Sequence, residues 1–186
     1  MRLIFIAMVM SILSWASVGN ADVGPGDTDA QLDELFRLLK ESDLEDFLDI
    51  ERDIVDIWTD SGSAAMNLLL ERGRLATATE DYPKALEHLS ALIDHAPEFS
   101  AGWNARATVY YFIDEYALAI ADIRQALILN PRHFGALNGL ALILEDIGKP
   151  EAAYKAYIMA QELHPHLHMV NEAILALRRD IDGVAL

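Results

Sequence analysis

Apolar side chains recur at three- and four-residue intervals along most of this chain. The first clear stripe comprises Leu32, Leu35, Phe36 and Leu39, and similar stripes follow as far as Ile181. This spacing places the apolar side chains on one face of a helix, whereas the strict alternation typical of strands is absent from residue 29 onward. The pattern predicts an all-α protein with helices over nearly the whole of this region.

A period of 34 residues organises the centre of the chain. Pro97, Pro131 and Pro165 are spaced by this interval, and segments 66–99, 100–133 and 134–167 align without gaps. Positions 8 and 20 of each segment are small, position 4 is large, and position 32 is proline. The small residues at positions 8 and 20 are Gly73, Ala107, Ala141, Ala85, Ala119 and Ala153. A period of this length is typical of stacked helix pairs.

Elementary packing explains these positions. Small residues allow the two helices of a pair to approach closely, and the large residues beside them fill the remaining space. The proline at position 32 ends the second helix and turns the chain into the next segment. Each segment therefore predicts a helix, a turn and a second helix.

The same positions resemble the tetratricopeptide repeat, in which residue 4 is large, residues 8 and 20 are small, residue 24 is aromatic or apolar and residue 32 is proline. The resemblance covers residues 66–167. It implies a right-handed α-solenoid of three helix pairs, at 66–99, 100–133 and 134–167.

Stacked repeats require covered ends. Residues 29–65 contain two apolar stripes but lack the small residues and the proline of the repeats, so we expect an N-terminal helical hairpin that caps the stack. At the other end, Val170, Ile174, Leu177 and Ile181 follow helical spacing. Segment 168–186 is therefore expected to be a C-terminal capping helix.

Residues 1–21 have the pattern of a secretory signal peptide. Arg2 precedes an apolar run over 3–13, and Gly19-Asn20-Ala21 supplies small residues for cleavage. The run is short for a bilayer-spanning helix, although an uncleaved N-terminal anchor is the alternative. Residues 22–28 are rich in turn formers and predict a flexible N-terminus. We therefore expect a periplasmic protein, stabilised by packing alone because it has no cysteine.

Charge and missing motifs exclude several functions. The formal net charge is −16, so DNA, RNA and anionic membrane surfaces are poor partners beyond the signal peptide itself. Phosphate-binding glycine loops, HExxH helices and nucleophile elbows are absent from the sequence. We expect no catalysis and no cofactor.

An acidic segment and a histidine cluster remain as candidate sites. Residues 41–60 contain nine acids and one base; a solvated helix face is the favoured interpretation, and a basic partner is the alternative. His164, His166 and His168 are weak candidates for a metal site. Pro165 already explains this stretch as a turn, so a metal-binding accessory protein is only the alternative function.

The resemblance supplies a candidate groove, because tetratricopeptide ligands commonly lie along the first helix of each repeat. The matching residues include Leu70, Arg74, Asn104, Thr108, Tyr111, Phe112, Asn138, Leu142 and Glu145. Asn104 and Asn138 share one repeat position, where an amide can both donate to and accept from a peptide backbone. Tyr111 and Phe112 are candidate aromatic anchors, although Phe112 could instead pack against a neighbouring repeat.

The carboxylate clamp of chaperone-binding members is not expected here. The matching positions hold Leu70, Ala105, Gly135 and Gly139, and only Arg74 is cationic. The sequence therefore predicts a non-catalytic scaffold or adaptor of the bacterial cell envelope, which binds another envelope protein or an extended peptide segment in the groove. The oligomeric state stays open.

Overall fold

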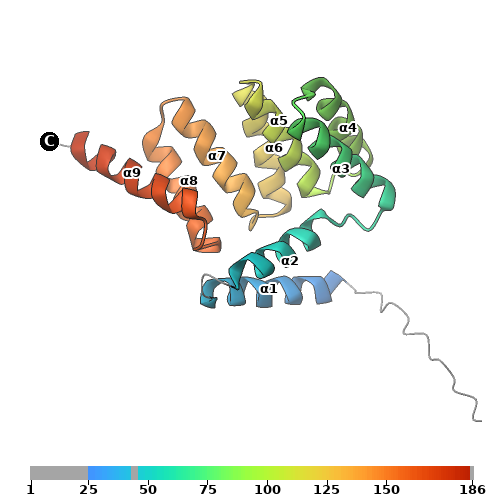
Figure 1. Ribbon diagram of the computed structural model, residues 1–186, viewed down its shortest axis with the longest axis horizontal. Coiled ribbons are helices and arrows are strands. Elements are labelled where there is room, and N and C mark those ends of the chain that lie inside the picture. Colours follow the sequence, from blue (N-terminus) through green and yellow to red (C-terminus); the bar gives the residue numbers. More distant parts are fainter. Residues whose placement is uncertain (1–24, 43–45, 185–186) are drawn as a thin grey trace, which may run out of the picture.

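The computed structural model describes residues 25–42 and 46–184, and all regular structure within these ranges is helical (Figure 1). The helices are α1 (Pro25–Glu41), α2 (Phe47–Thr59), α3 (Ala64–Ala78), α4 (Tyr82–His95), α5 (Ser100–Phe112), α6 (Tyr116–Leu129), α7 (Phe134–Asp146), α8 (Pro150–Leu163) and α9 (His168–Val184). The signal peptide predicted at 1–21 lies outside the described residues. None of the helices in the described ranges is long and apolar enough to cross a membrane.

Three helix pairs, α3–α4, α5–α6 and α7–α8, stack side by side as the α-solenoid that the repeat predicts. Ala85, Ala119 and Ala153 are fully buried at the close contact within each pair. At Gly73, an added Cβ would lie 2.5 Å from the Leu89 side chain. The small residues are therefore required by the distance between the paired helices.

The turn inside each pair has the same backbone conformation. Glu80, Asp114 and Gly148 occupy equivalent positions, with φ angles of 60°, 61° and 70°. This left-handed region ends a helix compactly and favours glycine. Two of the three turns therefore place a non-glycine residue in a conformation that costs free energy.

The C-terminal helix α9 covers the last repeat. Its residues Val170, Ile174 and Leu177 are buried in a cluster with Leu137 and Tyr157. This arrangement agrees with the capping helix predicted from the spacing of its apolar residues.

The N-terminal hairpin does not cap the stack, contrary to the sequence-based expectation. Its first helix also begins earlier than expected, at Pro25, inside the segment 22–28 that was predicted to be flexible. Proline suits the first position of a helix because its φ is already helical and its missing N–H is not needed there. Residues 22–24 lie outside the described ranges.

The hairpin lies along the turns that precede α7 and α9 (Figure 1). Phe36, Ile54 and Trp58 pack there against Phe134 and Leu167. The hairpin lacks the small residues that let the two helices of a repeat pack closely, and its apolar stripe is rich in aromatic rings. It therefore packs on the rings and loops at the edge of the stack instead of on α3.

This placement leaves the first face of the stack uncovered. Val109 and Ile143 share one repeat position and are buried by the preceding repeat. At the same position in the first repeat, Leu75 is 64 % exposed, and Leu68, two turns of helix earlier on the same face, is 44 % exposed. The first repeat thus keeps apolar residues for a neighbour that the described residues do not supply.

Candidate binding groove

A groove crosses α3, α5 and α7 and consists of two adjoining hollows. One has a volume of about 420 Å³ and lies between α3, the start of α4 and α5. The other, of about 320 Å³, lies between α5 and α7. Asn104, Thr108 and Phe112 line both hollows, so α5 forms the centre of the groove.

Most of the residues predicted for the groove line it. They are Arg74, Asn104, Thr108, Tyr111, Phe112, Asn138 and Leu142. Leu70 does not, because it is buried in the core between the first two repeats and only 3 % exposed. Glu145 lies beyond the lining and accepts a hydrogen bond of 2.6 Å from the Tyr157 hydroxyl. Leu70 is therefore a packing residue, and its assignment to the groove was wrong.

An aromatic wall stands at the middle of the groove. The Phe112 ring stacks on Tyr82 of the first repeat, with ring centroids 6.1 Å apart, and lies 5.8 Å from Tyr111. The Phe112 side chain nevertheless stays 52 % exposed. Both interpretations of Phe112 therefore hold in part, since it contacts the neighbouring repeat and presents an open apolar face to the groove.

Two asparagines lie on the groove lining, one on α5 and one on α7. Asn104 and Asn138 are half-buried, and neither side-chain amide makes a hydrogen bond to another described residue. An amide in this situation has a free donor and a free acceptor. The pair can therefore bind the N–H and C=O groups of an extended chain.

The far end of the groove carries acids and tyrosines. Tyr116 donates a hydrogen bond of 3.1 Å to Asp114 and lies 3.5 Å from Asp146. The bond to Asp114 raises the pKa of the Tyr116 hydroxyl to about 12. Burial, followed by the bond to Glu145, raises the pKa of Tyr157. These tyrosines thus remain neutral donors that hold the carboxylates in place at physiological pH.

Sequence reasoning missed Tyr82, Tyr116 and Tyr157 as neighbours of the groove. Tyr82 and Tyr116 occupy the same repeat position, at the start of the second helix of each pair. That repetition was the available signal, because one repeat position faces one surface of the stack.

The three histidines considered for a metal site have separate surroundings. His164 is fully buried and lies 3.2 Å from Glu51, although the contact lacks hydrogen-bond geometry. His166 donates from Nε2 to the carbonyl of Leu39 at 3.0 Å, and His168 points to solvent near Glu172. Within the described residues, no three potential ligands converge. The arrangement therefore offers no support for the metal-binding alternative.

The acidic segment at 41–60 is mainly a solvated face. Asp49, Asp53 and Asp56 are exposed on α2, opposite the buried Ile54 and Trp58. Glu51 is the exception among these acids, since it is half-buried and faces His164. Asp43 and Glu45 lie outside the described residues.

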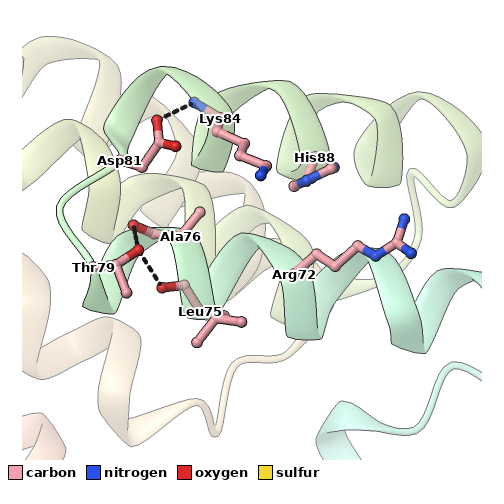
Figure 2. A pocket seen from close by; sticks show the side chains of 7 residues that line it. All are labelled: Arg72, Leu75, Ala76, Thr79, Asp81, Lys84 and His88. Carbon is pink, nitrogen blue, oxygen red and sulfur yellow. Dashed lines mark hydrogen bonds between the residues drawn. The ribbon is translucent and has the colours of Figure 1, made fainter.

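The uncovered face of the first repeat contains a third hollow, of about 490 Å³ (Figure 2). Arg72 and Leu75 of α3 lie along one side, and Lys84 and His88 of α4 lie along the other. Arg72 and Lys84 give this hollow two positive charges against the single negative charge of Asp81, whereas the chain as a whole is strongly anionic.

Comparisons with known proteins agree with this architecture. A family model described as the tetratricopeptide repeat matches residues 104–167. A TPR repeat-containing protein of Rhizobium etli is 34 % identical over 154 residues, which cover 82 % of this chain and 76 % of that protein.

Solved structures share the fold at lower identity. The first TPR of Spaghetti (RPAP3), bound to the HSP90 peptide SRMEEVD, superposes with a TM-score of 0.61 at 22 % identity, covering 64 % of this chain and 95 % of that one. The TPR2B domain of yeast Sti1, in complex with an Hsp70 peptide, gives a TM-score of 0.59 at 18 % identity, covering 63 % and 99 %.

Proposed function

The chain belongs to the tetratricopeptide repeat family, and from this we propose that it is a non-catalytic adaptor of the bacterial cell envelope that binds an extended segment of another envelope protein. A role in protein–protein interaction follows from the repeat fold itself. The envelope setting and the binding groove are the specific parts of the proposal.

The unpartnered amides of Asn104 and Asn138 carry the proposal for the groove. They lie at one repeat position on adjacent helices, and Phe112 stands exposed on α5 beside the first of them. The two amides can hydrogen-bond to the main chain of a peptide, and Phe112 offers one apolar contact. These are the two components of binding to an extended peptide.

The nature of the groove favours an internal segment over a free C-terminus. The positions that match a carboxylate clamp hold the buried Leu70 together with Ala105, Gly135 and Gly139, which supply no cation. Arg74 is the one cation among the described residues that line the groove, so a free carboxylate would exchange its hydration for a single ion pair. Recognition of the backbone does not have this cost.

The envelope setting is supported by the N-terminal residues 1–21, whose basic, apolar and small-residue order is that of a signal peptide. Cell fractionation together with intact-mass analysis tests it. A periplasmic protein that begins at Asp22 supports export with cleavage. A cytoplasmic full-length chain contradicts the setting, and a membrane-bound full-length chain identifies an uncleaved anchor.

Photocrosslinking in cells tests the groove itself. The wild type is compared with a variant that carries Asn104→Ala, Phe112→Ala and Asn138→Ala, after circular dichroism has shown that the variant is folded. The matched control is Ile128→Ala, which truncates an exposed residue of α6 that does not line the groove. We expect a partner captured by the wild type and the control to be lost by the groove variant. Equal capture by all three proteins would place binding on another surface.

A further inference from the structure

Three of the six histidines of the chain lie where the hairpin contacts the repeats. His133 stacks on Trp58 of α2, with ring centroids 4.8 Å apart and an angle of 27° between the planes. His166 stacks on Phe47 at 4.9 Å and 14°. His164 is fully buried, edge-on to Phe134 at 4.8 Å. The contact between the hairpin and the turns is thus built from imidazole rings facing aromatic rings.

The neutral form of His133 is required by its hydrogen bond. Its Nδ1 accepts the backbone N–H of Ala136 at 3.2 Å and so caps α7. A proton on Nδ1 would remove this acceptor, and the ring is almost completely buried under Trp58. Burial accordingly lowers the pKa of His133 to about 4.

The charges around His133 do not favour its protonation. Arg74 on α3 opposes a second positive charge there. Arg132, the preceding residue, is paired with Asp33 of α1, so that acid is already engaged, and the guanidinium lies over Phe36. No carboxylate is paired with His133 itself among the described residues. Acid must therefore either leave His133 neutral or separate it from Trp58.

His164 lies near a carboxylate that would raise its pKa, but burial lowers the pKa by more. Glu51 of α2 favours the protonated ring, whereas desolvation and the adjacent His166 disfavour it. Desolvation is the larger effect and lowers the pKa of His164. His168 and Glu172 on α9 are exposed and face each other.

We propose that acidification weakens the docking of the α1–α2 hairpin on the repeats, so that the hairpin opens while the three helix pairs stay folded. The hydrophobic clusters inside and between the repeats consist of side chains that do not titrate at mildly acidic pH, so the repeats keep these contacts when His133 is protonated, although they lose its cap on α7. Gly62, at a φ of +72°, lies in the short connection between α2 and α3 and offers a position about which the hairpin can turn.

The direction and size of the effect follow from proton linkage. The docked hairpin depresses the pKa of His133, so the open form binds more protons and docking weakens as pH falls below about 6.5. With a docked pKa of about 4, His133 alone weakens docking by about 30-fold between roughly pH 7.5 and pH 5. His164 acts in the same direction and adds to this factor.

Hydrogen exchange of the full chain tests the proposal. Protection factors of the α2 amides, corrected for the intrinsic exchange rate, are compared at about pH 7.5 and pH 5. We expect them to fall by about 30-fold or more, with little change in α5 and α6. A fall of less than threefold, or an equal fall throughout the repeats, would contradict the proposal.

Two variants distinguish titration from general instability. His133→Phe with His164→Phe keeps aromatic packing but removes the titrating groups, so its α2 protection should be the same at both pH values. The matched control, His95→Gln, changes an exposed histidine of α4 and should behave as the wild type. If the double variant opens at low pH like the wild type, the histidines are not the cause.

NMR of the imidazole C–H signals covers the case in which the double variant fails to dock at neutral pH. In the wild-type chain we expect His133 and His164 to titrate below pH 6.5, the ordinary histidine value, whereas α2 protection already begins to fall near that pH. Titration at the ordinary histidine value while α2 remains protected would overturn the proposal.

Discussion

The first and second repeats present the same side to the N-terminal end of the stack, yet one is buried and the other open. In the second repeat, Arg106 makes two hydrogen bonds to Asp122, at 2.7 and 3.0 Å, and a third to Ser90 of the first repeat at 3.2 Å. The equivalent residues of the first repeat are Arg72 and His88, which face each other across an open hollow.

The difference shows that one repeat position acquires its role from its neighbour. Arg106 is covered by the first repeat, so its charge requires a buried carboxylate and a stack on Trp103. Arg72 remains in water and requires neither. Terminal repeats are atypical for this reason, since only one of their faces is constrained by packing.

The largest difference in stability between equivalent substitutions is expected at the Arg106–Asp122 ion pair, which the first repeat lacks. Replacing Asp122→Ala leaves the largely buried Arg106 without its carboxylate partner and is expected to lower the free energy of unfolding by about 3–5 kcal/mol. His88→Ala, at the equivalent position, should change it by less than about 0.5 kcal/mol. Urea denaturation followed by circular dichroism measures both. Similar losses in the two variants would mean that the face of the first repeat is covered in solution.

An apolar position on the same side of the repeats gives the next largest difference in stability. Ile143→Ala removes a side chain that is buried between repeats and should cost about 2–5 kcal/mol. Leu75→Ala, at the same repeat position, removes an exposed side chain and should cost about 0.5 kcal/mol or less. The same denaturation series compares them. A cost above about 2 kcal/mol for Leu75→Ala would show that another surface packs on it.

Substitutions in the turns inside the repeats should change stability least, and Glu80→Gly and Gly148→Ala should act in opposite directions. Glu80→Gly removes the steric strain of a non-glycine residue in the left-handed conformation and is expected to stabilise the chain by up to about 1 kcal/mol. Gly148→Ala places a Cβ in the same conformation and should destabilise it by about 1 kcal/mol. Thermal unfolding of both variants checks this, and equal signs would refute the assumption that the three turns are equivalent.

The repeats were predictable from the sequence because their contacts are local. Positions 8, 20 and 32 recur in each segment, so the 34-residue spacing alone assigns Gly73, Ala85 and Pro97 to their roles. The groove residues followed from helical periodicity in the same way, with one error. Leu70 shares its repeat position with Asn104 and Asn138. Because its side chain is apolar, it packs in the core of the first two repeats instead of lining the groove.

The placement of the hairpin could not be predicted in this manner. Helical spacing shows which face of α2 is apolar, but it does not show which of several apolar surfaces that face will cover. The relevant signal was the chemistry of the turns: His133, His164 and His166 supply rings that contact Phe47 and Trp58, and Phe134 contacts Phe36. Hydrophobic periodicity shows which residues share a face of one helix, so it cannot predict which distant segment that face will contact.

The hairpin also sets the order in which the chain can complete its fold during synthesis. Asp33 and Arg132 are 99 residues apart, and Leu39 and His166 are 127 apart. At translation rates of about 5–20 residues per second, the hairpin waits roughly 5 to 25 seconds for its docking surface to be made. The first helices to emerge thus form one of the last tertiary contacts. A nascent chain that stops before His166 presents the rings of Phe36, Phe47 and Trp58 to whichever chaperone or export factor reaches them first.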